Sequence, residues 1–152
     1  MIAARVTDPN VRAAGPRGIL SQMNITAAAA IAFAIAAAGV IGFQVALALG
    51  VPWGSYAMGG AFPGTFPPRM RVAALVQAVL LAGTVAIVLS RAGLVLPGWS
   101  GVVGWLIWGV VAIAAAAVVL NAITPSAGER RLWVPVAVLM LASSLIVALT
   151  AA

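Results

Sequence analysis

Residues 25–49, ITAAAAIAFAIAAAGVIGFQVALAL, contain no charged side chain and are rich in alanine and larger aliphatic residues. An α-helix needs about 20 apolar residues to cross the roughly 30 Å hydrocarbon core of a bilayer. The stretch also lacks the alternation of polar and apolar residues that is typical of a transmembrane β-strand. Residues 25–49 are therefore predicted to form a membrane-spanning helix.

The whole chain has the composition of a membrane protein. Of its 152 residues, 64% are hydrophobic and 7% are charged, whereas a soluble domain is nearer to half apolar and about a quarter charged. Three more apolar stretches follow, at 72–90, 101–120 and 132–151. The sequence predicts an all-α membrane protein with four transmembrane helices in a compact bundle. Arginine pairs before the second and fourth stretches also suggest two tandem helical hairpins. Small residues, such as the pair Gly101 and Gly104 and the alanines of 25–49, can face a neighbouring helix.

Residues 1–22 differ from the rest, because they are polar and contain Arg5, Arg12 and Arg17. They are predicted to form a disordered tail, separate from a transmembrane domain at 23–152. Met23 would also serve as a start, so the tail is interpreted alternatively as a gene-model extension.

The arginines also bear on orientation, because cytoplasmic connections are enriched in basic residues. If the tail is real, the two sides of the membrane carry equal numbers of arginines. Without it, Arg91 stands alone on one side, opposite a set on the other: Arg69, Arg71, Arg130 and Arg131. This count favours cytoplasmic first and third connections. Arginine without lysine, together with abundant alanine and glycine, suggests a high-GC bacterial genome, so the membrane is expected to be the bacterial inner (cytoplasmic) membrane.

Several kinds of chemistry are absent from the sequence. The chain has no Cys and no His, and its two acids are Asp8 and Glu129. Disulfides, thiolate nucleophiles, imidazole bases and the common soft-metal sites are thereby excluded, and no cofactor is expected. The net charge of +6 comes from arginines scattered at segment ends, which suits lipid phosphates and topology rather than nucleic acid.

Polar and aromatic residues gather at one end of the predicted bundle, beside the unusual connection GVPWGSYAMGGAFPGTFPPRMR at 50–71. This connection is expected to lie in the headgroup layer or to fold over the mouth of the bundle. Polar residues within lipid are costly and often functional, although amides also cross-link helices and arginines also extend to phosphates. The candidate lipid- or partner-binding face comprises Gln44, Trp53, Tyr56, Arg69, Arg71, Gln77, Asn121, Glu129, Arg130 and Arg131.

Glu129 is the one acid expected near the membrane. Ser126 precedes it by three positions, which is the spacing of a capping box in which Ser accepts the Glu amide and Glu reaches back. Thr124 before Pro125 offers an alternative helix start. A role in the cap and in an ion pair with Arg130 is favoured over general acid catalysis.

Three stretches, PWGSYAMGG, FPGTFPPRMR and LNAITPSAGERRLWVP, occur along the chain in this order. They resemble a group of small four-span bacterial membrane proteins of unknown function from high-GC genomes. The resemblance covers about 50–71 and 120–149. It implies a four-span fold and a membrane location, and it supplies no activity.

The function expected from these observations is non-catalytic. The protein is predicted to act as an accessory subunit, or as a module that binds anionic lipid headgroups or a membrane protein partner, with a homo-oligomer as an open alternative. A small oligomeric transporter is a second possibility; since no predicted span contains an acid, it would carry an anionic or neutral solute rather than a cation. A lipid-modifying enzyme that uses Glu129 and the arginines is the third.

Overall fold

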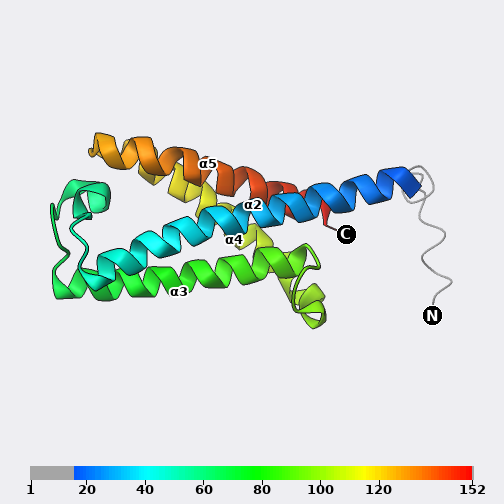
Figure 1. Ribbon diagram of the computed structural model, residues 1–152. Helices are drawn as coiled ribbons and strands as arrows, with labels where there is room; N and C mark the ends of the chain where they lie inside the picture. The colour runs from blue at the N-terminus through cyan, green and yellow to red at the C-terminus, as the bar shows by residue number, and fades with distance from the viewer. Residues whose placement is uncertain (1–15, 152) are drawn as a thin grey trace.

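The computed structural model describes residues 16–151, and over this range the chain is helical without β-strands. Figure 1 shows its long helices running back and forth beside one another. They are α2 (Pro16–Leu49), α3 (Pro68–Arg91), α4 (Ser100–Ile123) and α5 (Ala127–Thr150). The short 3-10 helices η2 (Gly54–Tyr56), η3 (Met58–Gly60) and η4 (Pro97–Trp99) lie in the connections.

The four long helices form a closed ring. Helix α2 packs against α3 and α5, and α4 packs against α5 and, less extensively, against α3. Each of the four contains a segment long and apolar enough to cross a membrane, by length and composition. The prediction of an all-α bundle of four membrane-spanning helices is confirmed.

The helices extend beyond the apolar stretches that predicted them. Helix α2 begins at Pro16, inside the segment predicted to be disordered, so residues 16–22 are helical, whereas 1–15 lie outside the described residues. Helix α3 begins at Pro68 and α5 at Ala127. Apolar composition identifies the part of a helix that lies in lipid, but a helix satisfies its own backbone and can continue into the polar layer. Proline at a first turn costs no hydrogen bond.

Alanine, rather than glycine, provides the close contacts between helices. The main buried cluster contains Ala30 and Ala37 on α2, together with Phe33 and with Ile107 on α4. By contrast, a Cβ added at the helical glycines 39, 42, 83, 101, 104 and 109 would meet no neighbouring atom within 4 Å. Gly101 and Gly104 therefore do not pack against another helix of the bundle, contrary to the prediction.

Polar contacts fasten the end of the bundle where the chain terminates. The hydroxyl groups of Thr26 and Thr150 lie 2.6 Å apart and share a hydrogen bond between α2 and α5. The guanidinium of Arg91, at the end of α3, donates to the backbone carbonyl of Ala151. Side chains thus link α2, α3 and α5 at this side of the bundle, and the connection between α2 and α3 lies at the opposite side.

Candidate functional site

The connection between α2 and α3, residues 50–67, folds back across the opposite end of the bundle; we call it the cap segment. In Figure 1 it lies at the left, beside the start of α5. The N–H of Gly54 donates to the carbonyl of Gly64 over 2.9 Å, which closes the segment into a loop. A Cβ at Gly54 would lie 1.9 Å from the carbonyl oxygen of Phe62, so the loop closes only around glycine.

The underside of the cap segment is apolar. Phe66 is buried in a cluster with Leu47 of α2 and Ala74 of α3. The Phe62 ring packs edge-on against Phe66, with centroids 6.0 Å apart. This burial explains why a connection so poor in charge does not need to extend into water.

Three hydrogen bonds fix the cap segment to the start of α5. The Gly59 N–H donates to Glu129 Oε2 over 2.7 Å. Ser126 Oγ donates to the Ser55 carbonyl over 3.0 Å, and Trp133 Nε1 donates to the Tyr56 carbonyl over 2.8 Å. Of the two placements expected for this connection, the structure has the one in which it folds over the mouth of the bundle.

Glu129 forms one half of the predicted capping box. Its backbone N–H donates to Ser126 Oγ over 3.2 Å, and Ser126 is the N-cap of α5. The carboxylate does not complete the box, because Oε2 accepts from the Gly59 N–H and, over 2.9 Å, from Thr124 Oγ1. Arg130 donates to the Thr124 carbonyl rather than to Glu129, so the predicted ion pair between neighbours is replaced by backbone contacts.

Beneath the cap segment lies a cavity of about 760 Å³. All four long helices contribute to its wall, and the cap segment closes one end. Its deep part is apolar, with Phe33 of α2, Leu81 of α3, Val110 of α4 and Met140 of α5. A volume of this size falls in the roughly 300–1,000 Å³ range of small-molecule sites.

The polar lining comes largely from residues that the sequence singled out: Gln44, Tyr56, Gln77, Asn121 and Glu129. Asn121 Nδ2 donates to the Ala117 carbonyl of its own helix over 2.7 Å, which leaves its amide oxygen free to accept. Gln44 is 9% exposed, but its amide atoms are not sealed in the protein and are accessible from the cavity that they line. An amide that opens to a cavity takes water or a ligand as its partner.

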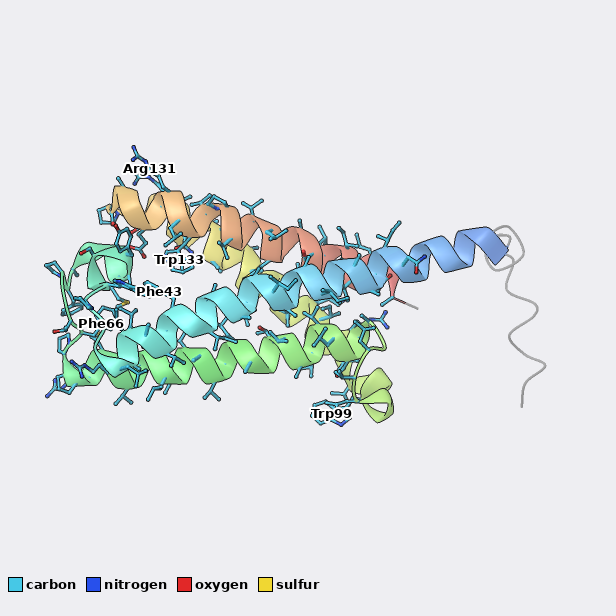
Figure 2. All side chains as sticks on the ribbon, in the orientation of Figure 1. Phe43, Phe66, Trp99, Arg131 and Trp133 are labelled. Carbon is cyan, nitrogen blue, oxygen red and sulfur yellow. The ribbon has the colours of Figure 1, made fainter. Side chains whose placement is uncertain are left out.

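The four arginines of the predicted face lie outside the cavity lining. Arg71 Nε donates to the Phe66 carbonyl over 2.9 Å, and Arg130 is bonded to Thr124. Arg69 and Arg131 are exposed, and Figure 2 shows the Arg131 side chain pointing away from the bundle. The predicted face therefore divides into an internal cavity and an external arginine surface.

Sequence reasoning missed the aromatic cluster that joins the cap segment to the helices. The Phe43 ring of α2 stacks on Trp53 with centroids 6.0 Å apart and meets Trp133 edge-on at 4.7 Å. In Figure 2, Phe43 and Trp133 lie side by side between α2 and α5. Trp53 belongs to the face expected from the sequence, but Phe43 gave no signal because it lies within an apolar run.

A seam runs between α3 and α4, the adjacent helices that pack least extensively. Along this seam, residues of both helices line the cavity and are also exposed. Ala73 and Gln77 do so on α3, and Ile113, Leu120 and Ile123 on α4. In a bilayer this seam would face lipid.

The described part of the chain contains no group of three or more His, Cys, Asp or Glu side chains that could hold a metal ion. No protein family, curated protein or solved structure was found to match the chain.

Proposed function

We propose that the protein is a non-catalytic protein of the bacterial inner membrane that binds anionic lipid headgroups at its external arginine surface. The observation that carries this proposal is the exposure of Arg69 and Arg131 at the end of the bundle that bears the cap segment. Guanidinium groups bind phosphate in a bidentate manner, and basic residues near a membrane surface attract anionic lipids.

The charge around these arginines supports the proposal. Glu129 is the one acid of residues 16–151, and its carboxylate is engaged by Gly59 and Thr124. It is therefore not placed to neutralise Arg69 or Arg131. The same engagement argues against a catalytic role, since a general acid has to exchange protons with a substrate.

The experiment is a lipid titration of purified protein in mild detergent, with bound lipids counted by native mass spectrometry. Each exposed arginine contributes about 1 kcal/mol near an anionic surface, so substituting both Arg69→Gln and Arg131→Gln is expected to weaken phosphatidylglycerol binding by about 2 kcal/mol. A higher salt concentration should weaken phosphatidylglycerol binding by the wild-type protein, and it should change binding by the double variant little.

The matched control keeps the charge at both positions, with Arg69→Lys and Arg131→Lys. It should retain most of the preference for phosphatidylglycerol over phosphatidylcholine. If the Gln double variant binds phosphatidylglycerol as tightly as the wild type, the external arginine surface is not a lipid site. A protein that co-purifies at fixed stoichiometry and is lost with the Gln variant would instead identify the surface as a subunit interface.

The proposed orientation places the cap segment and the α4–α5 connection in the cytoplasm. Because the chain has no cysteine, single reporters can be introduced at Thr65 in the cap segment and at Gly98 before α4, both of which are exposed. A membrane-impermeant maleimide added to intact spheroplasts should then label Gly98→Cys and spare Thr65→Cys until the membrane is permeabilised. The reverse pattern would invert the orientation.

A second candidate function is transport of a neutral solute, and the cavity is the observation that favours it. Helix-lined cavities with a few polar groups are where membrane transporters hold their substrates. Transport requires the cavity to open to both sides of the membrane in turn, so flux of solutes into proteoliposomes is its test. Binding without flux would leave the lipid-binding proposal as the better account.

A further inference from the structure

We infer that the cavity beneath the cap segment binds an uncharged lipid whose polar end carries hydroxyl or carbonyl groups, a diacylglycerol-like molecule. Its apolar chains would occupy the deep part of the cavity and the seam between α3 and α4. Its polar end would lie against Gln44. This site is separate from the external arginine surface and would take a different class of lipid.

The route of entry points to a molecule from the bilayer. The exposed lining residues at the seam are mainly apolar, including Ile113, Leu120 and Ile123 on α4. At the mouth of the bundle, by contrast, the cap segment is fastened to α5 by the Gly59–Glu129, Ser55–Ser126 and Tyr56–Trp133 contacts. A ligand that enters through the seam leaves these bonds intact, whereas one that enters at the mouth passes Tyr56 and Met58 of the cap segment, which line the cavity and are also exposed.

The polar groups of the cavity select the polar end of the ligand. The Gln44 carboxamide lines the cavity and offers it both a donor and an acceptor, and the Asn121 amide oxygen offers a further acceptor. A hydroxyl group donates and accepts, and an ester carbonyl accepts, so both complement this set. A lipid hydroxyl would thus give the Gln44 amide a hydrogen-bond partner inside the cavity.

Charge excludes an anionic headgroup from the cavity. Of the lining residues, Glu129 alone carries a formal charge, and it is negative. The arginines that could compensate a phosphate lie outside the lining, with Arg71 and Arg130 bonded to backbone carbonyls. A phosphate beside Glu129 in a low-dielectric cavity would meet repulsion without a counter-charge.

Trp133 lines the cavity and Trp105 is 85% exposed on α4, so the two residues provide an internal comparison. One single-Trp variant keeps Trp133 and another keeps Trp105, with Phe at the other tryptophan positions. Each is reconstituted in phosphatidylcholine vesicles that contain a small fraction of a bromine-labelled diacylglycerol, because bromine quenches tryptophan fluorescence on contact. Trp105 reports random encounters with the probe in the bilayer.

The inference predicts that the brominated diacylglycerol quenches Trp133 more strongly than Trp105 at the same mole fraction. Gln44→Leu in the Trp133 variant should raise the probe fraction needed for half-maximal quenching about fivefold, as expected for one lost hydrogen bond. With Arg69→Gln and Arg131→Gln also present, so that the external arginine surface is removed, brominated phosphatidylglycerol should show no preference for Trp133. Arg69→Gln and Arg131→Gln should leave the diacylglycerol result unchanged, which separates this inference from the proposed function.

Two alanines on α4 provide a matched pair of variants that fill the cavity or leave it open. Ala117 lines the cavity, whereas its neighbour Ala116 is exposed and does not. Ala117→Phe should abolish the excess quenching of Trp133, and Ala116→Phe should retain it, with thermal unfolding confirming that both variants fold. Equal quenching of Trp133 and Trp105 in the unfilled protein would overturn the inference. If brominated phosphatidylglycerol still quenched Trp133 more strongly than Trp105 with Arg69→Gln and Arg131→Gln present, the assignment of an uncharged headgroup would be overturned.

Discussion

The carboxylate of Glu129, at the start of α5, accepts a hydrogen bond of 2.7 Å from the backbone N–H of Gly59, which lies 70 positions earlier in the chain. Gly59 has a positive φ of 69°, a conformation that glycine adopts without strain. The same carboxylate oxygen accepts from Thr124 Oγ1. One side chain thereby connects the cap segment, the end of α4 and the start of α5.

Glu129→Gln is expected to loosen the cap segment. Hydrogen bonds to a charged group contribute about 1.5–3 kcal/mol, and an amide oxygen accepts more weakly than a carboxylate. The free energy of unfolding should fall by about 2 kcal/mol, and limited proteolysis should cut residues 50–67 faster. Arg131→Gln, at an exposed neighbour, should change neither measurement; equal losses in the two variants would contradict the role assigned to Glu129.

Gly54→Ala should disrupt the closure of the cap segment itself. The added Cβ would lie 1.9 Å from the Phe62 carbonyl oxygen and 2.8 Å from that of Gly64, and backbone atoms cannot move aside as a flexible side chain would. Forced overpacking of this kind costs about 1–3 kcal/mol, so thermal unfolding should occur at a clearly lower temperature.

The control for Gly54→Ala is Gly42→Ala in α2, where an added Cβ meets no atom within 4 Å. Alanine is the better helix former by about 1 kcal/mol, so this variant should be as stable as the wild type or more stable. A similar loss at both glycines would show that alanine is generally unfavourable in this bundle, and the close approach at Gly54 would then not explain the effect.

Trp133→Phe removes the donor to the Tyr56 carbonyl while keeping an aromatic ring beside Phe43. Loss of one hydrogen bond should lower the free energy of unfolding by about 1 kcal/mol. Trp105→Phe, at a largely exposed position, serves as the control and should have no effect. Combined with Glu129→Gln, Trp133→Phe should cost less than the sum of the two single changes, because both residues hold the same segment.

Much of this fold could be predicted because its driving force is compositional. Residues 25–49 and the three later apolar stretches correspond to the cores of α2 to α5, since only helices satisfy their backbones in lipid at such lengths. The start of α2 at Pro16 was missed because it lies outside the apolar stretches. The start of α5 at Ala127, by contrast, agrees with the cap expected at Ser126. The sequence also predicted at which end of the bundle the polar residues gather, because their positions along each span place them near the same side of the membrane.

The division of the candidate site could not be predicted in this way. Gln44 and Arg69 belong to the same end of the bundle, but one lines the cavity and the other lies outside its lining. That difference depends on the rotation of each helix about its axis, which apolar spans with little amphipathic character do not specify. The Glu129 carboxylate was expected to contact Arg130 or its own helix cap. Its actual partner, Gly59, could not be predicted, because it belongs to a loop whose path depends on tertiary contacts.

Gln44→Leu should have opposite effects on stability and on ligand binding. Gln44 is 9% exposed as a residue, and its carboxamide opens to the cavity, so in delipidated protein the carboxamide is only partly hydrated. Replacing it with an apolar side chain of similar size should raise the free energy of unfolding by about 1 kcal/mol.

Added diacylglycerol should raise the unfolding temperature of the wild type, since a ligand of the native state stabilises it, and should do so less for Gln44→Leu. Gln77→Leu, at an exposed lining position, is the comparison and should leave stability without ligand nearly unchanged. A polar residue that serves ligand binding lowers the stability of the ligand-free protein, whereas one that serves the structure raises it. A lower free energy of unfolding in Gln44→Leu would therefore show that Gln44 stabilises the bundle rather than binds a ligand.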